Sequence, residues 1–528
     1  MSKFNQKTAR ARGGAGVIES TNETVNHKGE KSYKRSAKSE LFLLGISDFV
    51  ADTFYESADN RQDRINALVS QIVVEDLEWL KSYVEWLRNT ANMRSVSLSI
   101  ALRAAHAMNK KGITGARSLV SSVLIRADEP GEALAFWHTE YGRKLPSAVK
   151  RGISDAAVRT YTQYSYAKYD SARNGYRFGD VLQLTHPKPK DPTQEALFKY
   201  TLDKMYNSDV TIPDELDMLT KRQQVLHLPK SKLRKLIDSS NGSKVLKDAG
   251  FTWEALSGSI EGGMDAKAWE TIIPSMGYMA LLRNLKNFHD AGVSREVMSA
   301  VANRISDKDE VARSRQLPFR FLSAYRELGR YGYNYFLTAL EDALEHSLVN
   351  VPALDGKTLI VIDNSGSMYY SSGYGSMTYA DTANLFGVAL AKRAKDATVV
   401  VYGSRSNELD FRTTSSTFHI VKNIVAMGGT DTAGTIRKHY NESYTRVIVL
   451  TDEQYGSSLY RRVSGDPYAV VNKSTPVYTW NLAGYGSGSK AESNRYTLGG
   501  LTDASFRTIP LVEASKDEQW PWEVDNKS

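Results

Sequence analysis

The 528-residue sequence contains no cysteine. This absence excludes disulfide frameworks, thiolate zinc sites, iron–sulfur ligation and a cysteine nucleophile. Any bound metal must therefore take oxygen or histidine ligands. The nine histidines show neither H-E-x-x-H spacing nor a Ser/His/Asp pattern, and the Gly-rich stretch 484–490 lacks Walker A spacing. We therefore expect a binding protein and not an enzyme.

The sequence also lacks any run of about 18 apolar residues, the length that a membrane-spanning helix requires. Residues 1–7 are polar and basic with no apolar stretch behind them, so they do not form a secretory signal. Hydrophobic residues make up 41% of the chain and charged residues 24%, as in ordinary soluble domains. These features predict a cytoplasmic protein with no membrane partner.

The positive charge is confined to one part of the chain. From residue 351 to the end, Lys plus Arg number 18 and Asp plus Glu also number 18, so the net charge of +8 falls within residues 1–350. A basic surplus in one region favours an anionic partner there, most often nucleic acid.

Composition and periodicity divide the chain into four parts. Residues 1–36 are basic and poor in aliphatic residues, which predicts a flexible arm that either binds phosphate or is simply solvated. Residues 37–352 show helical periodicity almost throughout, typical of stacked HEAT-like helical repeats. The expected helices include 65–72, 77–87, 97–108, 118–125, 194–205, 276–288, 295–305 and 319–345.

Residues 353–515 have a different pattern. Short apolar runs at 358–362, 398–402, 447–450 and 477–480 alternate with helical or Gly/Ser-rich stretches. This alternation predicts parallel strands with crossover helices, and hence a doubly wound α/β domain. Residues 516–528 form a C-terminal tail.

A metal-site motif follows the first strand of this domain. Asp363, Ser365 and Ser367 form D-x-S-x-S, Thr430 lies in a second loop, and Asp452 ends a later strand. Ligands gather at the carboxyl edge of parallel sheets, so these oxygens suit a hard divalent cation. We expect Mg²⁺, with Mn²⁺ or Ca²⁺ as alternatives. These elements resemble the metal-ion-dependent adhesion site (MIDAS) of von Willebrand factor A domains.

Cations and tyrosines lie close together in the helical region. Arg143, Lys144, Lys150 and Arg151 surround one expected helix start, and four tyrosines follow at positions 161, 164, 166 and 169. Stacking surfaces interleaved with cations suit single-stranded nucleic acid. A tyrosine-rich face can equally pack between repeats, and the sequence leaves both interpretations open.

Four segments carry a family resemblance: DTFYE from Asp52, KYDSARNGYRFGDVLQLTHPKPK from Lys168, MALLRNLKNFHDAGV from Met279 and LPFRFLSAYRE from Leu317. With the D-x-S-x-S domain behind a basic helical region, the chain resembles a bacterial or phage member of the Ro autoantigen family, defined by the TROVE domain. The resemblance covers nearly all of residues 37–515. It implies a monomeric ring of HEAT-like repeats closed against the A domain, with basic residues around a central hole.

The resemblance also implies partners and contact residues. Family members bind small noncoding Y RNAs outside the ring and take single-stranded 3′ ends of misfolded RNA into the hole, and in bacteria the RNA tethers polynucleotide phosphorylase, an exoribonuclease. The matching RNA-contact positions are Lys168, Arg173, Asn174 and His186, and Arg283 lies in another matching segment. Arg offers a fork for phosphate oxygens, and His can stack on a base. His186 precedes Pro187, so a turn residue is the other interpretation.

The leading hypothesis is therefore an RNA-binding protein of the Ro type, acting in RNA quality control or processing. The alternative is a protein-interaction scaffold whose metal site captures a partner's carboxylate.

Overall fold

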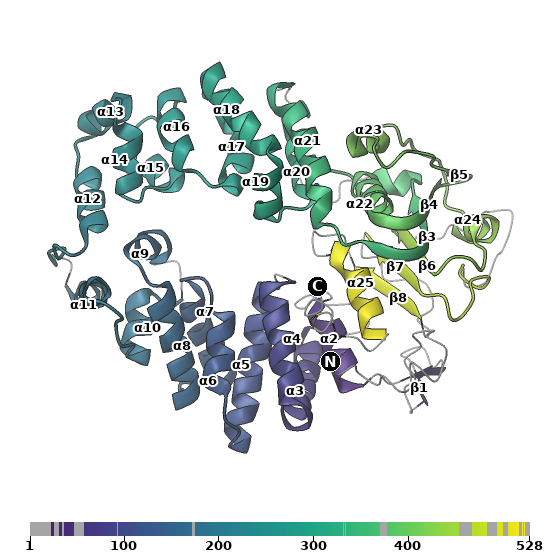
Figure 1. Ribbon diagram of the computed structural model, residues 1–528, viewed down its shortest axis with the longest axis horizontal. Coiled ribbons are helices and arrows are strands. Elements are labelled where there is room, and N and C mark those ends of the chain that lie inside the picture. Colours follow the sequence, from purple (N-terminus) through teal and green to yellow (C-terminus); the bar gives the residue numbers. More distant parts are fainter. Residues whose placement is uncertain are drawn as a thin grey trace. The chain divides into compact units, whose positions relative to one another are not determined.

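The chain divides into two compact units. The repeat unit comprises residues 62–277 and 288–297, and the sheet unit comprises residues 1–61, 278–287 and 298–528. The computed structural model (Figure 1) describes residues 23–25, 31–33, 36–46, 58–91, 93–171, 175–207, 209–330, 332, 334–369, 377–452, 467–482, 494–499, 505–516, 520 and 522.

The repeat unit is built from helices joined by short connections, as the 3.6-residue periodicity predicts. They are α3 (Ala58–Glu75), α4 (Leu77–Asn89), α5 (Arg94–Lys111), α6 (Ala116–Val123), α7 (Glu129–Tyr141), α8 (Ser147–Thr160), α9 (Gln163–Tyr169), α10 (Phe178–Thr185), α11 (Pro192–Tyr206), α12 (Asp217–Leu226), α13 (Lys230–Asp238), α14 (Gly242–Asp248), α15 (Trp253–Ser259) and α16 (Ala266–Ile272).

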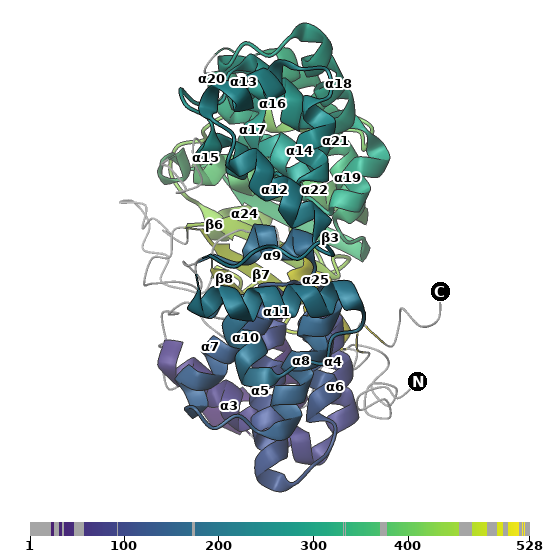
Figure 2. The same ribbon diagram turned by 90° about the vertical axis from the view of Figure 1, so that its left-hand side faces the viewer.

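Consecutive helices of the repeat unit pack on one another. Helix α5 packs on α4 and α6, and α8 packs on α6, α7 and α10. Leu197 and Tyr200 of α11 form a core with Leu216 and Leu219, and Tyr166 of α9 packs against it. Figure 2 shows α9 and α11 next to each other. Each helix thus buries its apolar face against its neighbours, as stacked repeats require.

The sheet unit contains most of two further repeat helices and three complete ones: α17 (Tyr278–Asp290), α18 (Arg295–Ser306), α19 (Lys308–Ser314), α20 (Pro318–Arg330) and α21 (Leu337–Ser347). The expectation of one continuous helix over 319–345 is wrong, because α20 ends at Arg330 and α21 begins at Leu337. Gly332 takes a φ of 74° between them, a left-handed conformation that ends helices.

The α/β domain has a six-stranded sheet with the order β5-β4-β3-β6-β7-β8. The strands are β3 (Leu354–Asp363), β4 (Ala394–Tyr402), β5 (Ser406–Glu408), β6 (Arg446–Thr451), β7 (Val477–Asn481) and β8 (Arg495–Gly499). The four predicted apolar strands are confirmed, and all four run parallel. Strands β5 and β8 were not predicted from the sequence, and β5 pairs antiparallel with β4, so the sheet is mixed.

Helices cover both faces of this sheet, as a doubly wound fold requires. Side chains alternate along β3. Ile360 and Ile362 face α22 (Tyr379–Arg393), where a Cβ added to Gly387 would lie 2.5 Å from Ile362 Cδ1. Leu359 and Val361 join a core on the other face that includes Ile436 of α24 (Thr432–His439).

Elements near the two chain ends meet in the sheet unit. Helix α2 (Ala37–Ile46) packs on α25 (Ser505–Lys516), and Phe42 of α2 lies edge-on to Trp520, with ring centroids 5.4 Å apart. Within the predicted arm, β1 (Glu23–Val25) and β2 (Lys31–Tyr33) pair antiparallel, and the rest of residues 1–35 lies outside the described residues, as does the DTFYE segment.

The predicted fold class, helical repeats followed by an α/β domain, is confirmed. Closure of the repeats into a ring with a central hole stays a prediction. Among the described helices, none combines the length and apolar content that membrane crossing requires.

Candidate metal centre and basic surface

Asp363 ends β3 at the carboxyl edge of the sheet, where the sequence places the metal motif. Its side chain is fully buried. Oδ1 accepts a hydrogen bond from the Ser365 amide at 2.8 Å, and Oδ2 accepts one from the Thr451 hydroxyl at 2.8 Å. The Tyr402 hydroxyl, on the neighbouring strand, is 3.4 Å from Oδ2. Residues from three segments of the chain thus hold this carboxylate in one orientation.

The second predicted loop lies directly beside the first. The Gly366 amide donates to the Gly428 carbonyl at 2.9 Å, and the Met427 amide donates to the Asn364 carbonyl at 2.8 Å. Thr430, two residues beyond Gly428, is half-buried. These backbone bonds bring the Thr430 loop to the D-x-S-x-S loop.

Two buried carboxylates share this edge of the sheet. Burial, with a smaller contribution from the negative charge of Asp452, raises the pKa of Asp363 to about 6, against hydrogen bonds from Ser365 and Thr451 that lower it. Asp452 is itself almost fully buried. Buried carboxylates of like charge are costly unless a cation or proton compensates them. The residues therefore fit a divalent cation.

The remaining ligands would be hydroxyls and water. The Ser365 and Ser367 hydroxyl oxygens are 3.3 Å apart beside Asp363. No group of three or more His, Asp or Glu side chains that could hold a metal occurs in the part of the chain that the structure describes. Asp431 does not point into the site, because Oδ1 caps α24 by accepting from the Gly434 amide at 2.9 Å. An oxygen shell with few charges suits a hard cation such as Mg²⁺.

Sequence reasoning missed the residues that orient Asp363. Thr451 and Tyr402 both hydrogen-bond to it, and the Tyr402 hydroxyl is also 2.9 Å from the Thr432 hydroxyl. Thr451 directly precedes the predicted ligand Asp452, so its place at the site could have been predicted from the sequence. Tyr402 carried no signal, because only strand register places it beside Asp363.

Four predicted RNA-contact cations gather at the start of α8. Arg143 and Lys144 lie in the loop before it and Lys150 and Arg151 in its first turns; all but the half-buried Lys150 are exposed. No acidic side chain occupies the first turn, and no side chain caps the helix. Within the described residues, none of the four cations forms an ion pair. The positive end of the helix dipole adds to their charge.

Lys168 lies on α9 among aromatic rings and is exposed. Its ammonium is 5.7 Å from the centroid of Tyr164 and 5.1 Å from that of Tyr169. Asp170, which adds a negative charge beside it in the sequence, is held by Arg177 at 2.5 Å and by the Phe178 amide at 2.9 Å. Its charge is therefore neutralised locally.

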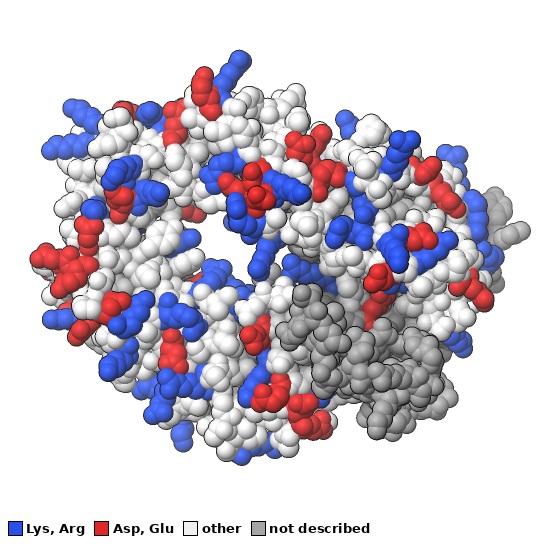
Figure 3. Space-filling model, in the orientation of Figure 1, with Lys and Arg blue, Asp and Glu red and all other residues white. Residues whose placement is uncertain are grey.

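The other predicted contacts are more dispersed. His186 is exposed and ends α10 with a φ of 50°, so the turn-residue interpretation of its backbone is confirmed. Arg283 is exposed on α17, in the sheet unit. Arg173 and Asn174 lie outside the described residues. On the face shown in Figure 3, Lys and Arg side chains are interspersed with Asp and Glu.

Comparisons with known proteins agree with this architecture. The TROVE domain model matches residues 229–335. RNA-binding protein RO60 of Deinococcus radiodurans is 24% identical over 474 residues, covering 84% of this chain and 86% of that protein. Telomerase protein component 1 of Rattus norvegicus is 38% identical over 96 residues, which are 18% of this chain and 4% of that protein.

A solved structure matches nearly the whole chain. The crystal structure of the Deinococcus radiodurans RO (RSR) protein superposes with a TM-score of 0.68 at 17% identity, covering 92% of this chain and 99% of that one. At this identity the match establishes the fold, including the helical repeats and the α/β domain.

Proposed function

Because the chain belongs to the Ro family, which the TROVE domain defines, we propose that it binds RNA. The proposed partners are a small structured noncoding RNA of the Y type and single-stranded 3′ ends of misfolded RNA. The proposed role is RNA quality control or processing, as a cytoplasmic monomer that works with an exoribonuclease such as polynucleotide phosphorylase. This is a binding role, in which the chain itself performs no chemistry on the RNA.

One observation carries the proposal. Arg143, Lys144, Lys150 and Arg151 gather at an uncapped helix start, and no described acidic side chain pairs with them. Some surface cations elsewhere in the repeat unit are paired, for example Arg117 with Asp155 at 2.6 Å and Lys244 with Asp248 at 2.6 Å. Cations left without internal partners are available for the phosphates of an RNA backbone.

The proposed role of the metal site is structural and separate from RNA binding. Asp363, Ser365, Ser367, Thr430 and Asp452 would hold a divalent cation, Mg²⁺ before Mn²⁺ or Ca²⁺. The cation would neutralise the buried carboxylates and stabilise the carboxyl edge of the sheet. RNA affinity would then depend little on the cation.

RNA binding is tested by affinity against salt concentration. We expect the wild-type protein to retain a small structured RNA when recovered from its native cells, and its log Kd to rise with log salt by about 0.7 to 0.9 per phosphate contacted. Changing the four cations at the start of α8 to Ala should weaken binding and flatten this slope. The same change at Lys395, Lys422, Arg437 and Lys473, four exposed cations of the α/β domain, is the matched control.

Two results would contradict the proposal. One is a wild-type protein that recovers no RNA above background. The other is an equal loss of affinity in the two quadruple variants. That result would mean that binding depends on the net charge of the protein and not on the cations at the start of α8. Recovery of protein partners that a chelator releases would instead favour the scaffold.

A further inference from the structure

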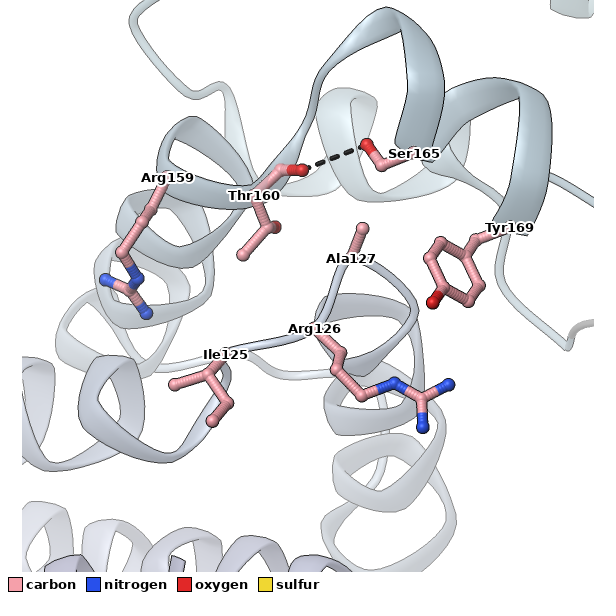
Figure 4. A pocket seen from close by; sticks show the side chains of 7 residues that line it. All are labelled: Ile125, Arg126, Ala127, Arg159, Thr160, Ser165 and Tyr169. Atoms are coloured by element: carbon pink, nitrogen blue, oxygen red, sulfur yellow. Dashed lines mark hydrogen bonds between the residues drawn. The ribbon is translucent and has the colours of Figure 1, made fainter. Parts of the chain in front are cut away.

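A first pocket of about 430 Å³ opens on one side of α9. Figure 4 shows its lining residues: Ile125, Arg126, Ala127, Arg159, Thr160, Ser165 and Tyr169. The Arg126 guanidinium lies 5.5 Å from the centroid of the Tyr169 ring, and Ile125 exposes 47% of its surface. The pocket thus combines an aromatic ring, an apolar floor and two cations.

The cations of this pocket are held in place. Arg126 donates to Asp128 through Nε at 3.1 Å and Nη2 at 2.9 Å. Arg159 donates to the Ser121 carbonyl at 2.6 Å and to the Leu124 carbonyl at 2.9 Å. A guanidinium fixed in this way loses little conformational entropy when a planar group stacks on it.

A second pocket of about 410 Å³ is lined by residues at the start of α9 and by residues of α11 and the loop before it. Its lining residues are Tyr161, Thr162, Gln163, Tyr164, Lys190, Asp191, Thr193, Gln194 and Leu197. Tyr164 exposes 46% of its surface. The buried Tyr161 hydroxyl has no hydrogen-bond partner in the part of the chain that the structure describes. Such an atom is normally satisfied by water or a ligand.

Helix α9 contributes residues to both pockets, and hydrogen bonds fix its N-terminus. Ser165 and Thr162 form a reciprocal capping box, and the Ser165 hydroxyl donates to the Thr160 carbonyl at 2.9 Å (Figure 4). Tyr164 and Tyr169 are five residues apart, so their Cα atoms are separated by about 7.5 Å along the helix axis. The Lys168 ammonium lies within 6 Å of both ring centroids.

We propose that the two pockets receive neighbouring bases of an unpaired RNA strand, one on Tyr169 and one on Tyr164, while Lys168 contacts the phosphate between them. The inference rests on the proposed RNA binding and identifies a site for its single-stranded part. Stacking on tyrosine and phosphate contacts to cations do not distinguish one base from another. The site should therefore bind unpaired RNA of any sequence. A duplex does not fit, because its bases already stack on and pair with one another.

The acidic groups near the pockets do not oppose this site. Asp128 is paired with Arg94 and Arg126. Asp191 caps α11 by accepting from the Gln194 amide at 2.8 Å. Two cations thus compensate the charge of Asp128, and the positive end of the α11 dipole stabilises that of Asp191.

The test uses the full-length protein and an unstructured 12-nucleotide oligouridine, with affinity measured by fluorescence anisotropy. Tyr164→Ala and Tyr169→Ala should each weaken binding by about 5- to 150-fold, the range for one stacked base. Tyr169→Phe keeps the ring and should bind as the wild type does. Tyr206→Ala, on α11 with 74% of its surface exposed, is the control that should change nothing.

A second measurement checks the position of the strand. Oligouridine with 4-thiouridine at single positions, irradiated on the wild-type protein, should crosslink to the peptide that contains α9. A duplex of the same length should compete poorly. Thermal unfolding of each variant separates lost binding from lost folding.

The outcomes distinguish this inference from the proposed function. If the wild type binds oligouridine and the folded Tyr164→Ala and Tyr169→Ala variants bind it equally well, the two pockets do not bind the bases. The proposed RNA binding would still stand. An equal loss of affinity in Tyr206→Ala would also contradict base binding in the two pockets. If the wild type binds neither oligouridine nor a structured RNA, the proposed function itself fails.

Discussion

The Thr451 hydroxyl donates a hydrogen bond to Oδ2 of Asp363 at 2.8 Å, across 88 residues of sequence. The two residues end β6 and β3, which are adjacent and parallel, so sheet register brings them together. The bond orients the buried carboxylate toward the loops that carry the other predicted cation ligands. One edge of the sheet therefore assembles the site from distant parts of the chain.

Removal of the Asp363 charge should abolish the response to divalent cations. In the wild type, Mg²⁺ at about 100 times its Kd should add about 2.7 kcal/mol to the free energy of unfolding. Asp363→Asn should lose this gain, yet without cation it should be at least as stable, because it buries no uncompensated charge. Thermal unfolding with and without Mg²⁺ measures both effects.

Asp431→Asn is the matched control for this experiment. Asp431 lies next to Thr430 but caps α24, so this change should cost at most about 1 kcal/mol and leave the Mg²⁺ response intact. An Asp363→Asn protein that Mg²⁺ still stabilises would contradict the assignment.

Glu129→Ala should strongly destabilise the repeat unit. The fully buried Glu129 carboxylate accepts from Arg88 at 2.6 Å, from Arg94 at 2.8 Å and from the Ile125 and Arg126 amides. Its removal leaves the buried Arg88 guanidinium without compensation, at a cost of about 3 to 5 kcal/mol. Urea unfolding measures the loss. Glu132→Ala breaks a more exposed contact to Arg94 and should cost less than about 1 kcal/mol.

Trp520→Ala should release helix α2 from the sheet unit. Trp520 exposes 1% of its surface and packs on Phe42 and Trp522. Truncation of a buried Trp costs about 3 to 5 kcal/mol. Amide hydrogen exchange should therefore accelerate in α2 more than in α24, and Trp522→Ala, which removes a half-buried ring, should have a smaller effect. Unchanged protection of α2 in Trp520→Ala would rule out this role.

His106 should make the repeat unit sensitive to acid. Burial, and then the charge of Lys110, lower the pKa of His106 below its ordinary value of 6.5. The unfolded chain then binds a proton more readily than the folded one, so stability falls as pH drops below about 6.5. His106→Phe should reduce the difference in unfolding free energy between pH 8 and pH 5. The exposed His227→Gln should leave it unchanged.

Local patterns in the sequence were sufficient to predict most helices and strands. The apolar runs predicted β3, β4, β6 and β7, and helical periodicity predicted α3 to α6. The same patterns missed β5, because Ser406–Glu408 is short and polar and exists as a strand only by pairing with β4. They also predicted one helix across Gly332, because the apolar spacing continues across the break between α20 and α21.

The motif D-x-S-x-S and the strand pattern were sufficient to predict a metal site at the carboxyl edge of a sheet, because parallel strands bring their ends together. Only the tertiary structure places Thr451 and Tyr402 on Asp363, and Arg126 over a tyrosine 43 residues away. Periodicity is a property of neighbouring residues, whereas these contacts depend on which helices and strands pack side by side. For that reason, the chemistry of the metal motif was readable in the chain, while the two pockets beside α9 emerged only from its folding.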